Sequence, residues 1–410
     1  MDDRAASAVP RVAAAAWIAP IALALLARLA FVAALPREIL WRDGREFETI
    51  ARSILAHHGY GLQTLRPPGY PTFIAGVYAL FGPSILALRL VEALLATAAV
   101  GVVAVVGGRR FGPLAGWIAA MLMALHPVLA LLPSTQYSEN VLVLMLVLAF
   151  TATDAAWARG GLARWGLAGA LLGIAALVRP NAVLLLPGLA LGLLAALRGE
   201  RRPWLLPGLA AALALVVAVT PWIVRCHRVQ GAWYFIATGG GRQFFLGNSA
   251  HATGSTTDVI YYTPEEQTTL DGLPNDIARE RWLYRHSMEF VRRDPGRVAQ
   301  LYLIKMGNLF APWPETVTQT LLSRWSRVAQ GIASVVVFAG ALIALARLRA
   351  SPAVWPLLGA IVTFALAQAV FHSVMRYRMA IEPCLLWLAG AGWASLAPVA
   401  SLARRLRIAA

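Results

Sequence analysis

Ten apolar runs divide this chain, and each lies near the ~20 residues that a helix needs to cross the hydrocarbon core of a bilayer. Lysine and arginine accumulate in the cytoplasmic loops of membrane proteins, so a correct set of spans places the basic clusters on alternate loops. Arg109-Arg110 and Arg201-Arg202 follow this rule. The sequence therefore predicts ten spans with both termini in the cytoplasm. These spans cover about 12–35, 84–106, 113–132, 139–157, 164–178, 181–197, 204–222, 327–346, 353–371 and 379–397.

The composition agrees with an all-α integral membrane protein. With 59% hydrophobic and 14% charged residues and a mean hydropathy of +0.64, the chain is too apolar for an ordinary soluble domain. The net charge of +16 comes almost wholly from short arginine clusters, because Lys305 is the only lysine. Such clusters report membrane topology, and no basic helix or aromatic-interleaved patch is long enough to bind nucleic acid.

The first apolar run is expected to remain in the mature protein as a span. It is longer than the apolar region of a signal peptide, and it carries Arg28 inside it. The two cysteines, Cys226 and Cys384, have neither the spacing of a metal site nor that of a disulfide framework. We expect both to pack within the bundle.

The alternation of basic clusters also places the short apolar run 70–81. It is too short for the ~20 residues of a span, and counting it as one would invert every later cluster. We therefore place it at the outer interface, beside a helix over 43–58. The predicted organisation has three regions. They are a transmembrane bundle over 1–222 with the first outer loop and juxtamembrane helices (36–83), a long extracytoplasmic loop with interfacial helices over 223–326, and C-terminal transmembrane helices over 327–410.

An amphipathic helix is predicted over 43–58, because apolar residues at positions 47, 50, 51, 54 and 55 share one face. Asp43 and Glu46 stand at its start with the spacing of a capping box. A helical wheel also puts Asp43 at the edge of the apolar face, where a lipid-linked substrate would arrive. Both acids are therefore candidate caps and candidate catalytic groups, and the two roles are compatible.

Arg66 precedes Pro67 and Pro68, and each proline disfavours helix in the residue before it. An arginine fixed in extended backbone at the interface suits a phosphate, because its planar fork makes bidentate, charge-assisted hydrogen bonds. The alternative is contact with lipid headgroups or simple snorkelling. We predict that Arg66 binds phosphate.

Further candidates lie on the predicted outer face. Glu139 opens the fourth span, where the helix dipole stabilises a carboxylate, and an acid at membrane depth is also a functional candidate by default. Arg242 follows three glycines whose amides form a potential anion nest. Lys305 and Arg376 are further outer cations that we predict to bind phosphate, and Arg179 stands at the hinge between the fifth and sixth spans.

No cofactor is expected from the side-chain pattern. The histidines show no ligand spacing such as HExxH, so a divalent cation has no support from ligand spacing although the chemistry would allow one. Arg378 and Glu382 lie at i, i+4 and are expected to pair with each other.

In their order along the chain, these segments resemble a known family. The motifs are an acid soon after the first span, Arg66-Pro67-Pro68, Ser138-Glu139, LVRPNAV over 177–183, PWIVR over 221–225, FFLGNSAHATG over 244–254 and RYRMAIEP over 376–383. Together they are similar to those of dolichyl-phosphate-mannose-protein mannosyltransferases and aminoarabinose lipid A transferases. The resemblance implies a GT-C fold, a helical bundle of about ten spans with juxtamembrane helices and a site on the outer face.

The resemblance also implies roles for individual residues. Asp43 matches the general base, Arg66 matches the residue that contacts the donor phosphate, and Glu139 matches an acidic position at the start of the fourth span. Arg242 matches an arginine of the loop after the seventh span. The chain departs from aminoarabinose transferases at Leu65, where these can carry a metal-ligand glutamate.

The expected activity is transfer of one sugar, with inversion, at the outer face of a bacterial inner membrane. The implied partners are a polyprenyl-phosphate-linked sugar donor, a lipid, glycan or protein acceptor, and membrane lipids. A polytopic transporter or lipid-linked sugar flippase is the alternative. Transporters usually show paired repeats with broken helices at the midplane, whereas the polar residues here collect at one face. A non-enzymatic assembly partner is a third reading, and an activity assay separates it from the first.

Overall fold

The computed structural model describes residues 14–196, 204–254, 261–313 and 322–405, and every element in these ranges is a helix. Each predicted span coincides with one helix or with a helix and its short neighbour, so the predicted fold class is confirmed. The spanning elements are α1 (Ile18–Ala34), α4 (Ile85–Phe111), α5 (Pro113–Leu125), α7 (Glu139–Arg159), α8 (Leu162–Val178), α9 (Leu186–Ala196) with η3 (Pro180–Leu185), α10 (Leu205–Gln230), α16 (Arg324–Leu348), α17 (Val354–Gln368) and α18 (Glu382–Ala394).

Length and composition separate these helices into three groups. Four of the described helices, α4, α7, α10 and α16, are long and apolar enough to cross a membrane alone. Two bent groups of helices also pass this test if each is counted as one span: α5 with α6 (Pro127–Leu131) and η2 (Leu132–Ser134), and α18 with α19 (Ala397–Arg405). The shorter apolar helices α1, α8, η3–α9 and α17 complete a bundle compatible with ten spans.

The predicted third span is broken at its outer end. Its two parts are bent by 63° at His126, which is extended because Pro127 follows it. Pro127 starts the new helix α6, and Nδ1 of His126 caps it by accepting a hydrogen bond from the Leu129 amide. The break turns the chain toward the first outer loop.

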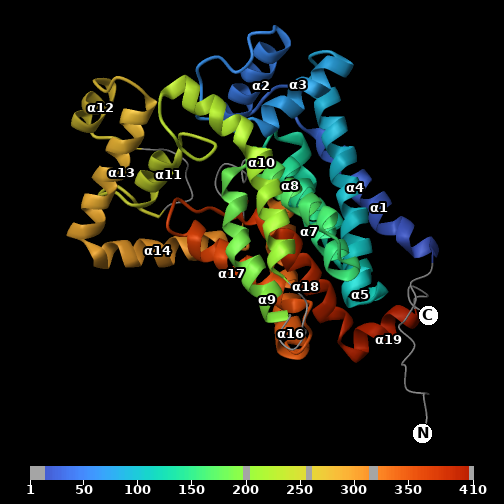
Figure 1. Cartoon of the computed structure of the whole chain (residues 1–410). Coiled ribbons are helices and arrows are strands. Elements are labelled where there is room, and N and C mark those ends of the chain that lie inside the picture. Colours follow the sequence, from blue (N-terminus) through green and yellow to red (C-terminus); the bar gives the residue numbers. More distant parts are fainter. Residues whose placement is uncertain (1–13, 197–203, 255–260, 314–321, 406–410) are drawn as a thin grey trace.

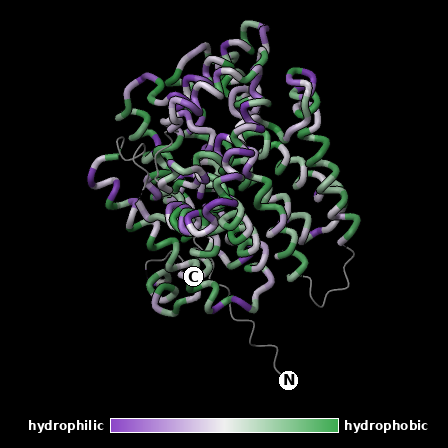
Figure 2. The backbone as a smooth tube through the Cα atoms, turned by 90° about the vertical axis from the view of Figure 1, so that its left-hand side faces the viewer, coloured by the Kyte–Doolittle hydropathy of each residue, from purple (hydrophilic) through white to green (hydrophobic). Residues whose placement is uncertain are grey.

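Helices at one end of the bundle form the predicted outer face. They are α2 (Arg42–Leu55), α3 (Gly69–Phe81), α11 (Gly240–Gly247), α12 (Pro264–Asp271), α13 (Asp276–Arg293) and α14 (Pro295–Leu309). Figure 1 shows α2 and α3 at the top of the bundle and α11–α14 along one side, with α5, α16 and α19 at the opposite end. In Figure 2 hydrophobic residues follow the bundle helices, and most hydrophilic ones gather in the loop-rich upper part.

Small residues let the spanning helices approach closely. A Cβ on Gly188 of α9 would lie 1.8 Å from the carbonyl oxygen of Gly359 in α17, and one on Gly169 of α8 would lie 1.9 Å from that of Ala211 in α10. Helices packed in lipid rely on such close contact, because burial of apolar surface gives little advantage there.

Two arginines of spanning helices fasten the first outer loop. Arg89 in α4 donates to the carbonyl oxygens of Pro36 (2.8 Å) and Glu38 (3.0 Å), just after α1. Arg225 in α10 donates to those of Gln63 (2.9 Å) and Gly61 (2.6 Å), just before Arg66. The start of the loop and the turn before Arg66 are therefore anchored to the bundle.

Candidate active site

The two acids at the start of α2 bind one arginine. NH2 of Arg66 lies 2.6 Å from Oδ1 of Asp43, and Nε lies 2.8 Å from Oε2 of Glu46. Helix α2 begins at Arg42, and its N-cap, Trp41, makes no side-chain cap. The capping-box alternative for Asp43 and Glu46 is therefore wrong. Their i, i+3 spacing serves instead to put both carboxylates on one face of α2.

Arg66 is rigidly placed by its neighbours. Its backbone N–H donates to Oε1 of Gln63 at 3.0 Å, and its guanidinium lies 5.1 Å from the ring centroid of Phe47. Three residues later, a Cβ on Gly69 would lie 2.8 Å from the backbone nitrogen of Val178 at the end of α8. Only glycine allows this approach, which presses the Arg66-Pro67-Pro68 turn against the residue before Arg179.

A second group of charges surrounds Glu139, whose side chain is buried at the start of α7. Its Oε1 lies 2.7 Å from NH1 of Arg179 and 3.2 Å from Nε of Arg376. Arg179 ends α8, and Arg376 lies in η4 (Met375–Ala380), which links α17 to α18. The structure thus brings together Glu139 and Arg376, two of the sequence-predicted residues, with Arg179 as a third member.

Aromatic rings hold these arginines in place. Trp41 and Tyr137 are stacked, with ring centroids 5.9 Å apart. The guanidinium of Arg376 lies 4.2 Å from the centroid of Tyr137, and that of Arg179 lies 5.1 Å from that of Tyr377. Cation–π contacts of this kind strengthen when the groups are desolvated. Sequence reasoning missed these rings, although Tyr137 and Tyr377 flank predicted charged residues in the chain.

The two charge groups form one site. Gly44 of α2 packs against the turn that precedes Glu139, since a Cβ on it would lie 3.3 Å from Cβ of Gln136. Burial alone would raise the pKa of Asp43, but the charges of Arg66, Arg376 and Arg179 hold it below its usual value. We call Asp43, Glu46, Arg66, Glu139, Arg179 and Arg376 the charged cluster.

Lys305 makes no ion pair with this cluster. Its Nζ donates to the carbonyl oxygens of Gly247 (3.0 Å) and Val370 (3.3 Å) and to Oδ1 of Asn248 (3.1 Å). Burial lowers the pKa of Lys305 to about 8. All three ammonium hydrogens thus have acceptors within the chain, and they fasten α14 to α11 and to the end of α17.

Arg242 lies one turn into α11, beside the first outer loop. The amide of Thr238 donates to the carbonyl oxygen of Thr64 at 3.0 Å, which brings the glycine turn next to Leu65. The predicted anion nest is already filled, because the amide of Gly241 donates to Oε2 of Glu280 at 2.6 Å. In this structure the glycines bind an internal carboxylate.

Buried polar atoms without a hydrogen-bond partner occur on the segments that carry the charged cluster. On or beside these segments they include Oγ of Ser134, Oε1 of Gln136, Oε2 of Glu139 and Oγ of Ser373.

Two further predictions can be compared with the side chains. Arg378 and Glu382 do pair, with Nε 2.9 Å from Oε2, and both are fully buried. Arg378 also donates to the carbonyl oxygen of Ala311 and to Oγ of Ser334, so it fixes the segment that presents Arg376. Among the residues that the structure describes, no group of three or more His, Cys, Asp or Glu is placed to hold a metal ion.

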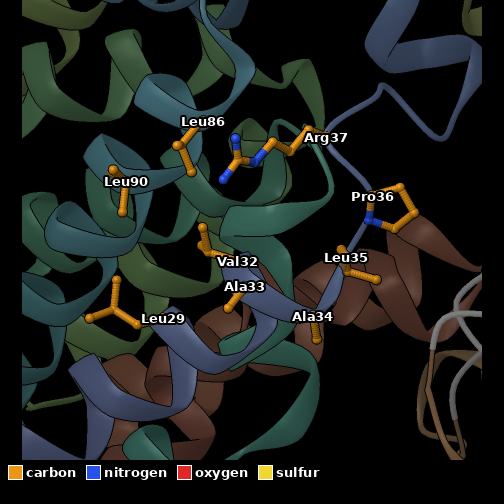
Figure 3. A pocket seen from close by; sticks show the side chains of 9 residues that line it. All are labelled: Leu29, Val32, Ala33, Ala34, Leu35, Pro36, Arg37, Leu86 and Leu90. Carbon is orange, nitrogen blue, oxygen red and sulfur yellow. The ribbon is translucent and has the colours of Figure 1, made fainter.

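An open groove of about 570 Å³ lies between α1 and α4, on the membrane side of the first outer loop. Its walls are the apolar side chains of Leu29, Val32, Leu86 and Leu90, and Arg37 reaches across its outer rim (Figure 3). None of its lining residues belongs to the charged cluster.

Comparison with known proteins identifies the architecture. Residues 65–223 match the sequence model of the dolichyl-phosphate-mannose-protein mannosyltransferase family, a range that includes Arg66, Glu139 and Arg179. The structure is similar to the Archaeoglobus fulgidus oligosaccharyltransferase AglB in complex with an inhibitory peptide and a dolichol-phosphate, with a TM-score of 0.55 and 13% identity over 95% of this chain. This chain has the GT-C fold. It spans about half of that enzyme, 51% of its length.

Two other structures are also similar. The apo oligosaccharyltransferase of Archaeoglobus fulgidus has a TM-score of 0.54 and 14% identity, covering 91% of this chain and 50% of that one. ArnT from Cupriavidus metallidurans bound to undecaprenyl phosphate has a TM-score of 0.46 and 16% identity, covering 93% of this chain and 78% of that one. No curated protein matches the sequence. The family match confirms the resemblance predicted from the motifs, and nothing supports the transporter alternative.

Proposed function

We propose that this protein is a membrane glycosyltransferase that moves one sugar from a polyprenyl-phosphate-linked donor to an acceptor hydroxyl, with inversion. The observation that carries the proposal is the contact between Asp43 and Arg66, 2.6 Å apart, in a site with two more arginines. It sets a base beside a phosphate-binding group in the fold of enzymes that act on lipid-linked sugars.

Arg66, Arg179 and Arg376 supply the phosphate-binding part of the site. When the glycosidic bond breaks, its electron pair moves to the phosphate oxygen, and the leaving polyprenyl phosphate gains one negative charge. Cations that are already oriented stabilise this charge without reorganising during the reaction. The aromatic rings against Arg376 and Arg179, and Glu139 between them, provide that orientation.

Asp43 supplies the base. Its carboxylate takes the proton of the acceptor hydroxyl while the acceptor oxygen bonds to the sugar carbon and the phosphate leaves from the opposite side. Direct displacement with one base inverts that carbon. Once phosphate has taken over Arg66, Asp43 loses its closest positive partner, so its pKa rises and it accepts the proton more readily.

The remaining predicted residues take supporting roles in this proposal. Glu46 pairs with Arg66 until phosphate replaces it, and Glu139 sets the distance between Arg179 and Arg376. Arg242 remains a predicted phosphate contact from the outer loop. Lys305 is better placed to brace that loop, because its three donors are engaged by chain oxygens.

The membrane setting extends the proposal. The alternation of arginine clusters supports cytoplasmic termini and an extracytoplasmic site, and the expected location is a bacterial inner membrane. The polyprenyl donor would then reach the charged cluster from the bilayer. The division into regions 1–222, 223–326 and 327–410 stays a prediction.

The bound lipid tests the proposal. The wild-type protein is purified in mild detergent from a bacterial membrane, and native mass spectrometry measures the lipid that remains bound. We expect the mass of a polyprenyl phosphate or its sugar conjugate, and transfer of the sugar from that conjugate in a radiolabel assay. Bound undecaprenyl phosphate should be lost from an Arg66→Ala variant. Absence of such a lipid together with no binding of added undecaprenyl phosphate would overturn the proposal.

A further inference from the structure

A buried carboxylate below the charged cluster, Glu92, lies in the second turn of α4 and is fully buried. The hydroxyl of Tyr70 donates to its Oε1 at 2.6 Å, and Nδ2 of Asn140 donates to its Oε2 at 3.2 Å. The nearest arginine on the same helix, Arg89, is directed at backbone carbonyls after α1. An acid within a membrane span requires a functional explanation.

The Tyr70 contact leads to Arg66. Tyr70 lies in the first turn of α3, four residues after Arg66, and is itself fully buried. Its ring meets that of Phe47 edge to face at 5.1 Å, and the guanidinium of Arg66 lies against the same Phe47 ring. Tyr70 is therefore the buried support of the Arg66 turn.

The Asn140 contact leads to the other half of the site. Asn140 directly follows Glu139, which contacts both Arg179 and Arg376. Its Nδ2 also lies 3.4 Å from the backbone oxygen of Glu92, so the Asn140 amide contacts both the side chain and the backbone of Glu92. The start of α7 thus has its position set by the same residue that holds α3.

An ionised carboxylate suits this arrangement, because both of its oxygens accept hydrogen bonds. A carboxylate offers two oxygens, and each receives one donor, a tyrosine hydroxyl and an amide nitrogen. A glutamine at position 92 would keep the shape but replace one oxygen by an amide N–H, so the Tyr70 hydroxyl would have to accept instead of donate, or the Asn140 amide would have to turn over. In either case a hydrogen bond to a charged group becomes a weaker one between neutral groups, and Tyr70 and Asn140 are held less firmly.

We propose that Glu92 is a positioning residue for the donor phosphate. By binding Tyr70 and Asn140 together, it keeps Arg66 at a fixed distance from Arg179 and Arg376, so that the three guanidiniums close on one phosphate. This inference rests on the proposed function, because it assigns the arginines to a phosphate.

The test compares wild type with Glu92→Gln in lipid nanodiscs, with undecaprenyl phosphate as the probe. The dissociation constant is measured by titration, and the melting temperature is measured on the same samples. We expect a rise of about tenfold in the dissociation constant, equivalent to the loss of one charge-assisted hydrogen bond. Glu48→Gln is the matched control, because Glu48 also accepts from a tyrosine of α3, Tyr78, but contacts Arg52 and lies outside the charged cluster.

Two single-contact variants make the result specific. Tyr70→Phe and Asn140→Leu should each weaken binding, and combining either with Glu92→Gln should add little, because contacting residues are not additive. A lower melting temperature with an unchanged dissociation constant would overturn the positioning role and leave a purely structural one. If wild type itself does not bind undecaprenyl phosphate, the proposed function fails. If wild type and Glu92→Gln bind equally, only the present inference fails.

Discussion

Arg66 donates to Asp43 across 2.6 Å, although the two residues are 23 positions apart on different elements of the first outer loop. The contact joins the proposed base to the proposed phosphate clamp in one ion pair. It also means that, without donor, each group is held by the other. Donor phosphate must break this ion pair to bind Arg66, so changes to the pair should alter both donor binding and the reaction rate.

Replacing Asp43 by asparagine tests the base. The side chain keeps its size and a hydrogen bond to Arg66 but cannot take a proton at neutral pH. We expect the turnover rate to fall by ~10²–10⁴-fold, the usual contribution of a general base. Undecaprenyl phosphate should bind at least as tightly as to wild type, because Arg66 loses a competing anion. A folded Asp43→Asn protein that binds donor and turns over normally would contradict the role.

Glu46→Gln should make donor binding tighter, whereas the loss of a residue that contacts phosphate would make it weaker. Glu46 is partly exposed and competes with phosphate for Arg66 while also binding Arg42. A partly exposed ion pair contributes ~0–1 kcal/mol, so its removal should tighten donor binding by at most about fivefold. Titration with undecaprenyl phosphate measures this, with Glu48→Gln as the control. Weaker binding would show that Glu46 mainly orients Arg66.

Arg376→Lys keeps the charge and removes the planar fork. Lysine cannot reproduce the contact with Glu139 and the stacking on Tyr137 at once. We expect transfer from the identified donor to slow by ~10²-fold, comparable to the loss of one oriented transition-state donor. Steady-state rates give the effect, and Arg52→Lys on the same outer face serves as control. An unchanged rate in Arg376→Lys would remove this residue from the site.

The pH dependence should differ between free enzyme and donor complex. In the free enzyme Arg66, Arg376 and Arg179 hold the pKa of Asp43 below its usual value, so the base is ionised above that low pKa and is lost only in stronger acid. In the complex the phosphate neutralises these cations, and the pKa of Asp43 rises. The acid limb of kcat should therefore lie at higher pH than that of kcat/KM. Coincident limbs would contradict this exchange of partners.

Gly69→Ala probes the contact between α3 and α8. The added Cβ would lie 2.7–2.9 Å from atoms of Leu177 and Val178, two of them in the backbone, so α3 must move away. Such overpacking costs ~1–3 kcal/mol, and it displaces Arg66 from Arg179. We expect a lower melting temperature together with weaker binding of undecaprenyl phosphate. Gly76→Ala in the same helix, which meets nothing within 4 Å, should change neither.

The sequence by itself predicted a bundle of about ten spans and singled out Asp43, Arg66, Glu139 and Arg376, which the structure places in the charged cluster. The outer position of α2 and α3 stays a prediction from the same pattern. Apolar length and arginine alternation are local properties set by the bilayer, so they can be read without knowing any contact. Only the tertiary structure showed which groups these residues contact. Asp43 and Glu46 bind Arg66 instead of capping a helix. Glu280 binds the amide of Gly241, and Glu92 binds Tyr70 beneath the charged cluster. Side-chain periodicity reports the environment of a residue, whereas its partner depends on how distant segments pack.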